Sequence, residues 1–101
     1  MKFEQLQESI ALWAQEKGIS APENAYKQIF KVVEELGELC GSIAKDKRAE
    51  ELDAFGDVLV TIIILAEQRQ VDLVYSLQEA YNVIKDRTGK TVNGVFVKDE
   101  G

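Results

Sequence analysis

The fold of this chain is decided by residues 50 to 66, which read Glu50-Glu51-Leu52-Asp53-Ala54-Phe55-Gly56-Asp57 and then Val58-Leu59-Val60-Thr61-Ile62-Ile63-Ile64-Leu65-Ala66. The second half is rich in β-branched residues, which taken alone favour a strand. The apolar run, however, continues the helical spacing of the acidic half and ends in Glu67-Gln68-Arg69-Gln70. We therefore expect one helix over roughly residues 49–70. Because its centre is apolar on nearly every side, this helix needs a partner subunit to cover it.

Apolar residues at helical spacing predict three further helices. The first runs to about residue 17, stops at Gly18, and carries Phe3, Leu6, Ile10 and Trp13. The second begins at the start signal Ser20-Ala21-Pro22-Glu23, with Ser20 as N-cap, and runs to about Ala44. Its apolar stripe consists of Ile29, Val33, Leu36, Cys40 and Ile43. The fourth is expected from Asp72, as N-cap, to about Arg87.

The segment 88–101 contains glycines and β-branched residues, so we expect an extended tail that packs on the helices or on a neighbouring subunit. The connections between the helices are short, and short connections favour antiparallel neighbours. The sequence therefore predicts a single all-α domain over residues 1–101. Its architecture is expected to be four-helix bundle-like, with an extended C-terminal tail, in a homodimer or homotetramer.

Composition excludes several classes of function. The 101 residues include 12 basic and 18 acidic side chains, a net charge of −6, so we expect no general affinity for nucleic acid or anionic membrane. There is no histidine, which excludes Ser-His and Cys-His catalysis and histidine-containing zinc sites. The single Cys40 excludes an intramolecular disulfide and indicates the cytoplasm, and its apolar helical setting favours a buried core position. No secretory signal or membrane span is expected.

Acidic residues form two clusters on consecutive helices. On the second helix Glu35 and Glu38 share a face with Lys31 and Ser42, and on the third Asp53 and Asp57 lie one turn apart. If the two helices pair antiparallel, Glu38 comes near Asp53 and Glu35 near Asp57. Carboxylates gathered in this way raise one another's pKa unless a cation compensates them. The alternative is that they form an ordinary solvated helix surface.

A site with oxygen ligands only, and neither histidine nor thiolate, favours Mg²⁺, with Mn²⁺ as a substitute. A bound magnesium ion keeps water molecules and accepts phosphate oxygens as further ligands. The chemistry that such a site offers is hydrolysis of a phosphoanhydride, with a metal-activated water as nucleophile.

At these residues the chain resembles the MazG-like family of all-α nucleoside triphosphate pyrophosphohydrolases. The resemblance covers nearly the whole chain and is carried by Lys31–Glu38, by Phe55–Val60, and by Tyr81–Arg87 with Val92–Lys98, which are similar to a short phage-type branch. It implies Mg²⁺-dependent cleavage of a nucleoside triphosphate to monophosphate and pyrophosphate, by dimers or tetramers. Residue by residue, Glu35, Glu38 and Asp57 match metal-binding positions, and Glu34 completes the first motif.

One position departs from the family's pattern. The second motif of the family is Glu-x-x-Asp, but Ala54 stands where its glutamate is expected, three residues before Asp57. Asp53 lies one turn from Asp57 and can reach the same ion, so we expect Asp53 and Asp57 as the ligands from this helix. A shifted register through Glu50, Glu51 and Asp53 is the less favoured alternative. If Ala54 has disabled the site, the chain is a nucleotide-binding or interaction protein on the same fold.

Other residues are candidates for contact with the substrate or the attacking water. Glu34 and Glu35 are the candidates for orienting the water, as catalytic residues. Asn82, Lys85 and Arg87 resemble a phosphate-contacting cluster, or they are favourable charges at a helix C-terminus. Lys31 contacts phosphate or pairs with Glu35, and we favour the ion pair. For Trp13, which can stack on a base, core packing is the favoured interpretation, as it is for Tyr26, Phe30 and Tyr81.

Overall fold

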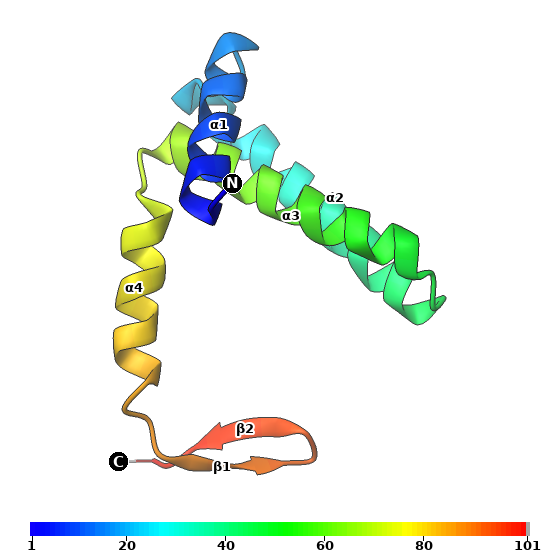
Figure 1. The fold of residues 1–101 in the computed structure, drawn as a ribbon, viewed down its shortest axis with the longest axis vertical. Helices are drawn as coiled ribbons and strands as arrows, with labels where there is room; N and C mark the ends of the chain where they lie inside the picture. Colours follow the sequence, from blue (N-terminus) through cyan, green and yellow to red (C-terminus); the bar gives the residue numbers. More distant parts are fainter. Residues whose placement is uncertain (101) are drawn as a thin grey trace.

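The structure, a computed structural model, describes residues 1–100 and is mostly helical. The predicted number of helices is confirmed, and a small two-stranded sheet follows them (Figure 1). In chain order the elements are α1 (Phe3–Glu16), a short 3-10 turn η1 (Pro22–Asn24), α2 (Ala25–Ala44), α3 (Arg48–Arg69), α4 (Leu73–Ile84), β1 (Gly89–Val92) and β2 (Val95–Lys98).

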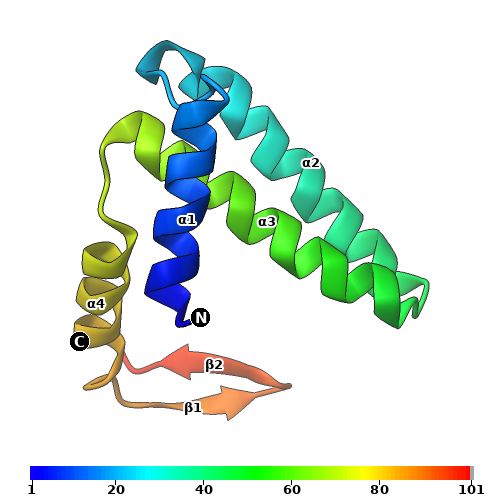
Figure 2. The same ribbon diagram turned by 45° about the horizontal axis from the view of Figure 1, so that its top comes forward.

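The centre of the molecule is a long antiparallel hairpin of α2 and α3, which lie side by side in Figures 1 and 2. Three residues, Lys45 to Lys47, connect the two helices, and Asp46 takes a left-handed φ of 54° there. Helix α3 confirms the helix predicted over residues 49–70 and supplies most of the buried residues: Ala54, Val58, Thr61, Ile63, Ile64, Ala66 and Gln68. Its apolar centre is therefore the core of the chain.

Helix α1 packs across the C-terminal half of α3 through the buried Ala11 and Ala14. A buried glutamine strengthens this contact, because the Gln68 side chain donates a hydrogen bond to the Ile19 carbonyl at 2.8 Å. Gly18 has a φ of +73°, which glycine adopts without steric cost, and it ends α1 as predicted.

Two predicted helix ends are wrong. Ser20 does not cap α2, because Pro22–Asn24 first form the 3-10 turn and α2 begins only at Ala25. Helix α4 ends at Ile84 rather than at Arg87, whose amide donates to the Ile84 carbonyl in a tighter three-residue turn. The predicted N-cap of α4 is confirmed, since the Asp72 carboxylate accepts a hydrogen bond from the Tyr75 amide at 3.1 Å.

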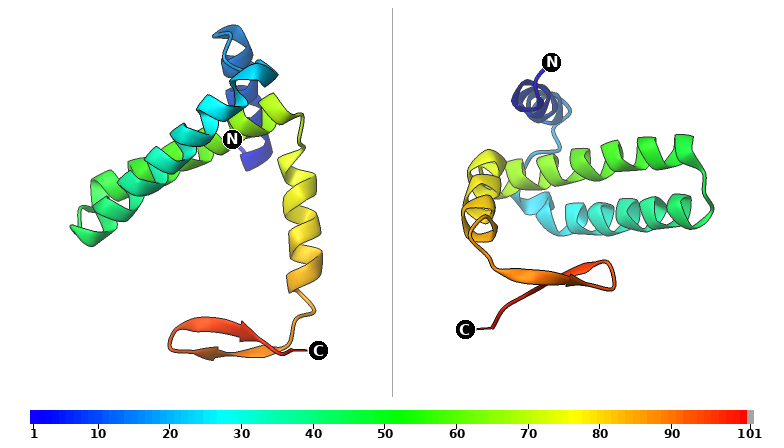
Figure 3. Two further views of the ribbon diagram at one scale, coloured as in Figure 1. Left: turned by 180° about the vertical axis from the view of Figure 1, so that it is seen from behind. Right: turned by 60° about the horizontal axis from the view of Figure 1, so that its bottom comes forward.

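The tail is extended, as predicted, and forms a β-hairpin that pairs Gly89 with Lys98 and Val92 with Val95. Asn93 and Gly94 make its turn, both with positive φ, as a two-residue hairpin turn requires. Every residue of both strands is exposed. Figure 3 shows α4 and the hairpin projecting away from the α2–α3 pair, so α4 does not close a four-helix bundle within one chain.

The chain is too open for a compact monomer. Its accessible surface is 8005 Å², whereas a monomer of 11.3 kDa is expected to expose roughly 5,700 Å². The radius of gyration is 16.3 Å, against about 13 Å for a compact chain of this length. Within residues 1–100, no large side chain is fully buried. No helix in this range is both long enough and apolar enough to cross a bilayer.

Several residues predicted to lie in the core are exposed instead. They are Trp13, Tyr26, Phe30 and Tyr81, together with Cys40 and the apolar stripe of α2. The physical reason is that one copy of the chain has no further element to place over them.

Candidate functional site

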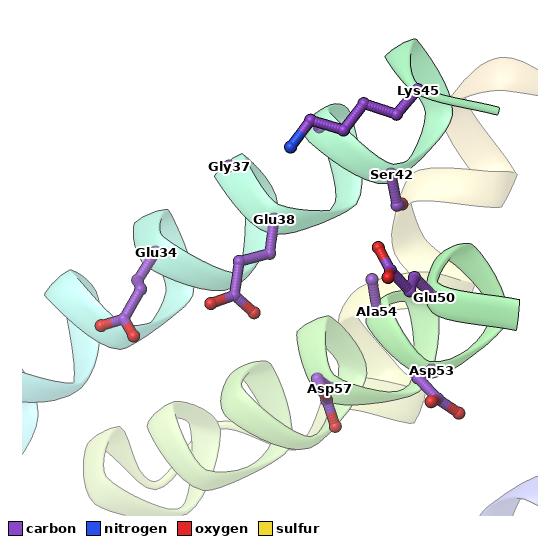
Figure 4. Close-up of a pocket in the computed structure, with 10 residues that line it drawn as sticks. Glu34, Gly37, Glu38, Ser42, Lys45, Glu50, Asp53, Ala54 and Asp57 are labelled. Carbon is purple, nitrogen blue, oxygen red and sulfur yellow. The ribbon is translucent and has the colours of Figure 1, made fainter. Parts of the chain in front are cut away.

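An open groove of about 580 Å³ runs along one side of the α2–α3 hairpin (Figure 4). Helix α2 and the residue that follows it contribute Glu34, Gly37, Glu38, Gly41, Ser42 and Lys45 to the lining, and α3 contributes Glu50, Asp53, Ala54 and Asp57. The groove thus collects five carboxylates, from both predicted acidic clusters, and one lysine. The predicted antiparallel pairing of the two helices is confirmed.

The groove follows from the spacing of small and acidic residues. Its lining residues recur every three or four positions on each helix, so they share one face. Small residues form its floor, where Ser42 is 5% and Ala54 is 6% exposed. The Ser42 hydroxyl donates to the Leu39 carbonyl at 2.8 Å and is thereby satisfied within its own helix. The longer carboxylates stand along the margins.

Basic residues neutralise only part of this charge. Lys31 pairs with Glu34 at 3.8 Å, Lys47 pairs with Glu50 at 3.8 Å, and Arg48 pairs with Glu51. The expected Lys31–Glu35 pair is wrong, because the side chain reaches Glu34 three positions on. Within residues 1–100 the remaining groove carboxylates, Glu38, Asp53 and Asp57, make no ion pair. Their charge is available to a cation from solution.

Glu35 lies half-buried beside the groove. Its Oε2 atom is enclosed and has no hydrogen-bond partner within residues 1–100. Burial raises the pKa of the Glu35 carboxyl above its ordinary value, and the negative charge of the neighbouring Glu38 raises the pKa further. The charges of Asp57 and Glu34 act in the same direction. Asp57 on α3 thus lies near enough to Glu35 on α2 for their like charges to repel, as the antiparallel pairing of the helices implies.

The candidate ligand atoms in the groove are all carboxylate oxygens, which are the ligands that a hard divalent cation prefers. They are not preassembled around one point, because within residues 1–100 no three Asp, Glu or Cys side chains stand close enough to hold an ion. Figure 4 shows the carboxylates of Asp53 and Asp57 directed away from α2. Cation binding at the groove therefore requires these side chains to change rotamer.

The predicted substrate-binding residues are not gathered here. Trp13, Asn82, Lys85 and Arg87 do not line the groove, and the Asn82 carbonyl oxygen accepts a hydrogen bond from Gln78 at 3.1 Å. Lys31 reaches the groove only through Glu34. Conversely, Lys45 lines the groove, although it is not among the site residues predicted from the sequence. The sequence does contain a signal for this position, because Lys45 stands seven residues after Glu38, which is two helical turns along the same face.

No protein-family model matches the chain, and no solved structure matches it. A curated relative is the uncharacterized 18.2 kDa protein in the rep-hol intergenic region of Haemophilus phage HP1 (strain HP1c1). It is 38% identical over 72 residues, which cover 71% of this chain and 44% of the relative. The chain thus spans less than half of the length of this relative. Its phage origin is consistent with the phage-type resemblance.

Proposed function

We propose that this chain is a Mg²⁺-dependent nucleoside triphosphate pyrophosphohydrolase, which converts a nucleotide triphosphate to its monophosphate and pyrophosphate. One observation carries the proposal: in the part of the chain that the structure describes, Glu38, Asp53 and Asp57 line one groove without ion pairs, beside a half-buried Glu35 with a raised pKa. An anionic substrate enters such a groove only together with cations. The MazG-like resemblance of the same residues supports the choice of reaction.

Glu35, Glu38, Asp53 and Asp57 would hold the ion, with Mn²⁺ as a substitute for Mg²⁺. When bound, the ion supplies an acidified water and neutralises phosphate oxygens. Glu34, on the margin of the groove, and Glu35, which lies beside it, would orient the attacking water and accept its proton. Lys45 is the basic group of the lining and is placed to contact a phosphate.

The test is incubation of the purified protein with each nucleoside and deoxynucleoside triphosphate and Mg²⁺, followed by an assay for pyrophosphate. We expect release from at least one nucleotide. Glu38→Ala should lower kcat/KM by roughly 100-fold or more, because losing even an outer-shell partner of a metal costs about 10- to 100-fold. Glu79→Ala, an exposed change on α4, is the control and should stay active. No release from any nucleotide would reject the activity, and an active Glu38→Ala would reject the site.

A second candidate is a nucleotide-binding protein without turnover. The observation in its favour is Ala54, which occupies the groove floor where the family has a carboxylate, and which is 6% exposed. This candidate predicts Mg²⁺-dependent nucleotide binding with no pyrophosphate. Ala54→Glu distinguishes the two, because a gain of hydrolysis in this variant, absent in Ala54→Gln, would show that the missing carboxylate had disabled the site.

A further inference from the structure

A second groove, of about 550 Å³, lies among α1, α3 and α4 and shares no lining residue with the acidic groove of α2 and α3. Within residues 1–100 it receives no residue from α2, so it is also separate from the apolar stripe of that helix. Most of its lining is apolar and comes from Phe3, Leu59, Ile62, Leu73, Val74 and Leu77. Leu77 is 69% exposed, so the chain itself leaves this apolar surface open.

Carboxylates border this apolar groove. An adjoining groove of about 550 Å³ has an acidic lining that consists of Glu4, Glu8, Glu67 and Asp72. Gln7 and Val74 line both grooves, which are therefore continuous, and we call the two together the α1/α4 groove. Within residues 1–100 no lysine or arginine lines it, and none of its four carboxylates makes an ion pair. An apolar surface with unneutralised negative charge beside it fits a partner that is both apolar and basic.

The hydrogen bonding of Gln7 also favours a basic partner. The Oε1 atom of this side chain is enclosed and has no hydrogen-bond partner within residues 1–100. An enclosed acceptor without a donor costs free energy. Lysine and arginine side chains carry donors and no acceptors, whereas an ionised carboxylate carries acceptors only. A basic partner can therefore supply the bond that Gln7 lacks, and an acidic partner cannot.

The spacing of the apolar residues on α4 indicates that the partner is a helix. Val74, Leu77, Tyr81 and Ile84 are all exposed and follow one another at intervals of three, four and three residues. This is the spacing at which one helix packs along another. On the other side, the lining residues of α1 run from Phe3 to Gln15, which is about 18 Å of helix. The α1/α4 groove is thus long enough for about three turns of an added helix.

We propose that the α1/α4 groove docks a basic amphipathic helix of another protein. A second copy of this chain does not supply such a helix, because each of its four helices contains more acidic than basic residues. Those helices would bring like charge to the groove, which opposes docking. The partner helix has apolar residues at heptad spacing toward α4, and lysine or arginine toward the carboxylates. This interaction goes beyond the proposed hydrolysis and does not depend on it.

The test uses a synthetic helix of about five turns, with leucine at heptad spacing and lysine on both flanks. Its matched control carries glutamate in place of every lysine. In fluorescence anisotropy the lysine peptide should bind with micromolar affinity, about tenfold more weakly when salt is raised from about 0.05 M to about 0.5 M, because salt screens exposed charges. NMR shift mapping should place it on the α1/α4 groove. Absence of binding, equal binding of the glutamate peptide, or mapping to the acidic groove of α2 and α3 would overturn the proposal.

Two matched substitutions on α4 test the position of the site. Leu77→Gln removes an apolar contact of the groove, whereas Val83→Gln changes an exposed residue that does not line it. Leu77→Gln should weaken binding of the lysine peptide about tenfold, as loss of a central interface residue does, and Val83→Gln should leave it unchanged. Glu8→Gln should weaken binding about threefold, because an exposed ion pair contributes little. Unchanged peptide binding by Leu77→Gln would reject the site. A change in its sedimentation alone would also reject the proposal, and would assign the groove to another copy of the chain.

Discussion

Glu35 is the residue at the groove where burial and the charges of neighbouring carboxylates act together. Glu35 is half-buried, one of its oxygens has no partner in the described part of the chain, and three other carboxylates act on it. The sequence alone predicted that Glu35 would lie near Asp57, because both follow from helical spacing and antiparallel pairing. It predicted the wrong partner for Lys31, which pairs with Glu34 rather than Glu35, because both glutamates are within reach and the choice depends on rotamers.

Glu35 should make the stability of the folded chain depend on pH. A raised folded-state pKa means that the folded protein keeps a proton that the unfolded chain has already lost. Without a cation, stability should therefore fall as the pH rises from about 4.5, the ordinary value for glutamate, through the raised pKa. Glu35→Gln should remove this fall, so that its Tm exceeds the wild-type Tm at pH 7 and equals it in acid.

The measurement is a series of thermal melts in metal-free buffers of different pH, with Glu79→Gln on α4 as the control for loss of one exposed carboxylate. Added Mg²⁺ should raise the Tm of the wild type more than that of Glu35→Gln, because a ligand that binds only the folded state stabilises it. Parallel pH profiles for the wild type and Glu35→Gln would contradict the assignment.

At the scale of secondary structure, the signals that were right are the ones with a specific hydrogen bond or dihedral angle behind them. Gly18 ends α1 with a positive φ, and Asp72 caps α4 through the Tyr75 amide. Ser20 matches the capping pattern, but Pro22 starts a 3-10 turn instead, so the α-helix begins later. The Asn93-Gly94 pair is a hairpin signal, and both residues have the positive φ of a hairpin turn, whereas the composition of the segment predicts only an extended tail.

Helix α4 should depend on its cap more than a buried helix does, since none of its residues is fully buried. Asp72→Ala removes the bond from the Tyr75 amide and should cost about 1 kcal/mol. Amide hydrogen exchange in α4 should then be about fivefold faster, while exchange in α3 stays unchanged. Asp72→Asn is the matched control, because its side-chain oxygen still accepts the bond. Equal exchange in Asp72→Ala and Asp72→Asn would show that the cap does not hold the helix.

For the molecule as a whole, amphipathic spacing identified the apolar stripe of α2 but could not say which molecule covers it. Trp13, Tyr26 and Cys40 are exposed in one chain, although their spacing is that of core residues. The length of the apolar centre of α3 did predict that a partner is needed, and the large exposed surface agrees with it. A sequence pattern reports that a face must be buried. It does not distinguish burial within a chain from burial between chains.

The thermal stability of the wild type should therefore depend on protein concentration. If unfolding and dissociation are coupled, a tenfold increase in concentration should favour the assembled state by about 1.4 kcal/mol per dimer and raise Tm by several degrees. Differential scanning calorimetry across a wide concentration range measures the shift. A Tm that is independent of concentration would mean that the single chain is stable in its open form.

The three-residue turn at Lys45–Lys47 has a consequence for the order in which the molecule forms. The turn joins the two longest helices, so their contacts are close in sequence, and local contacts form quickly. After dilution from denaturant, the α2–α3 hairpin should appear in a rapid phase whose rate is independent of protein concentration. Burial of the Cys40 thiol should follow in a slower phase whose rate rises with concentration. The acidic groove is then shaped by folding of the single chain, before any second copy has arrived.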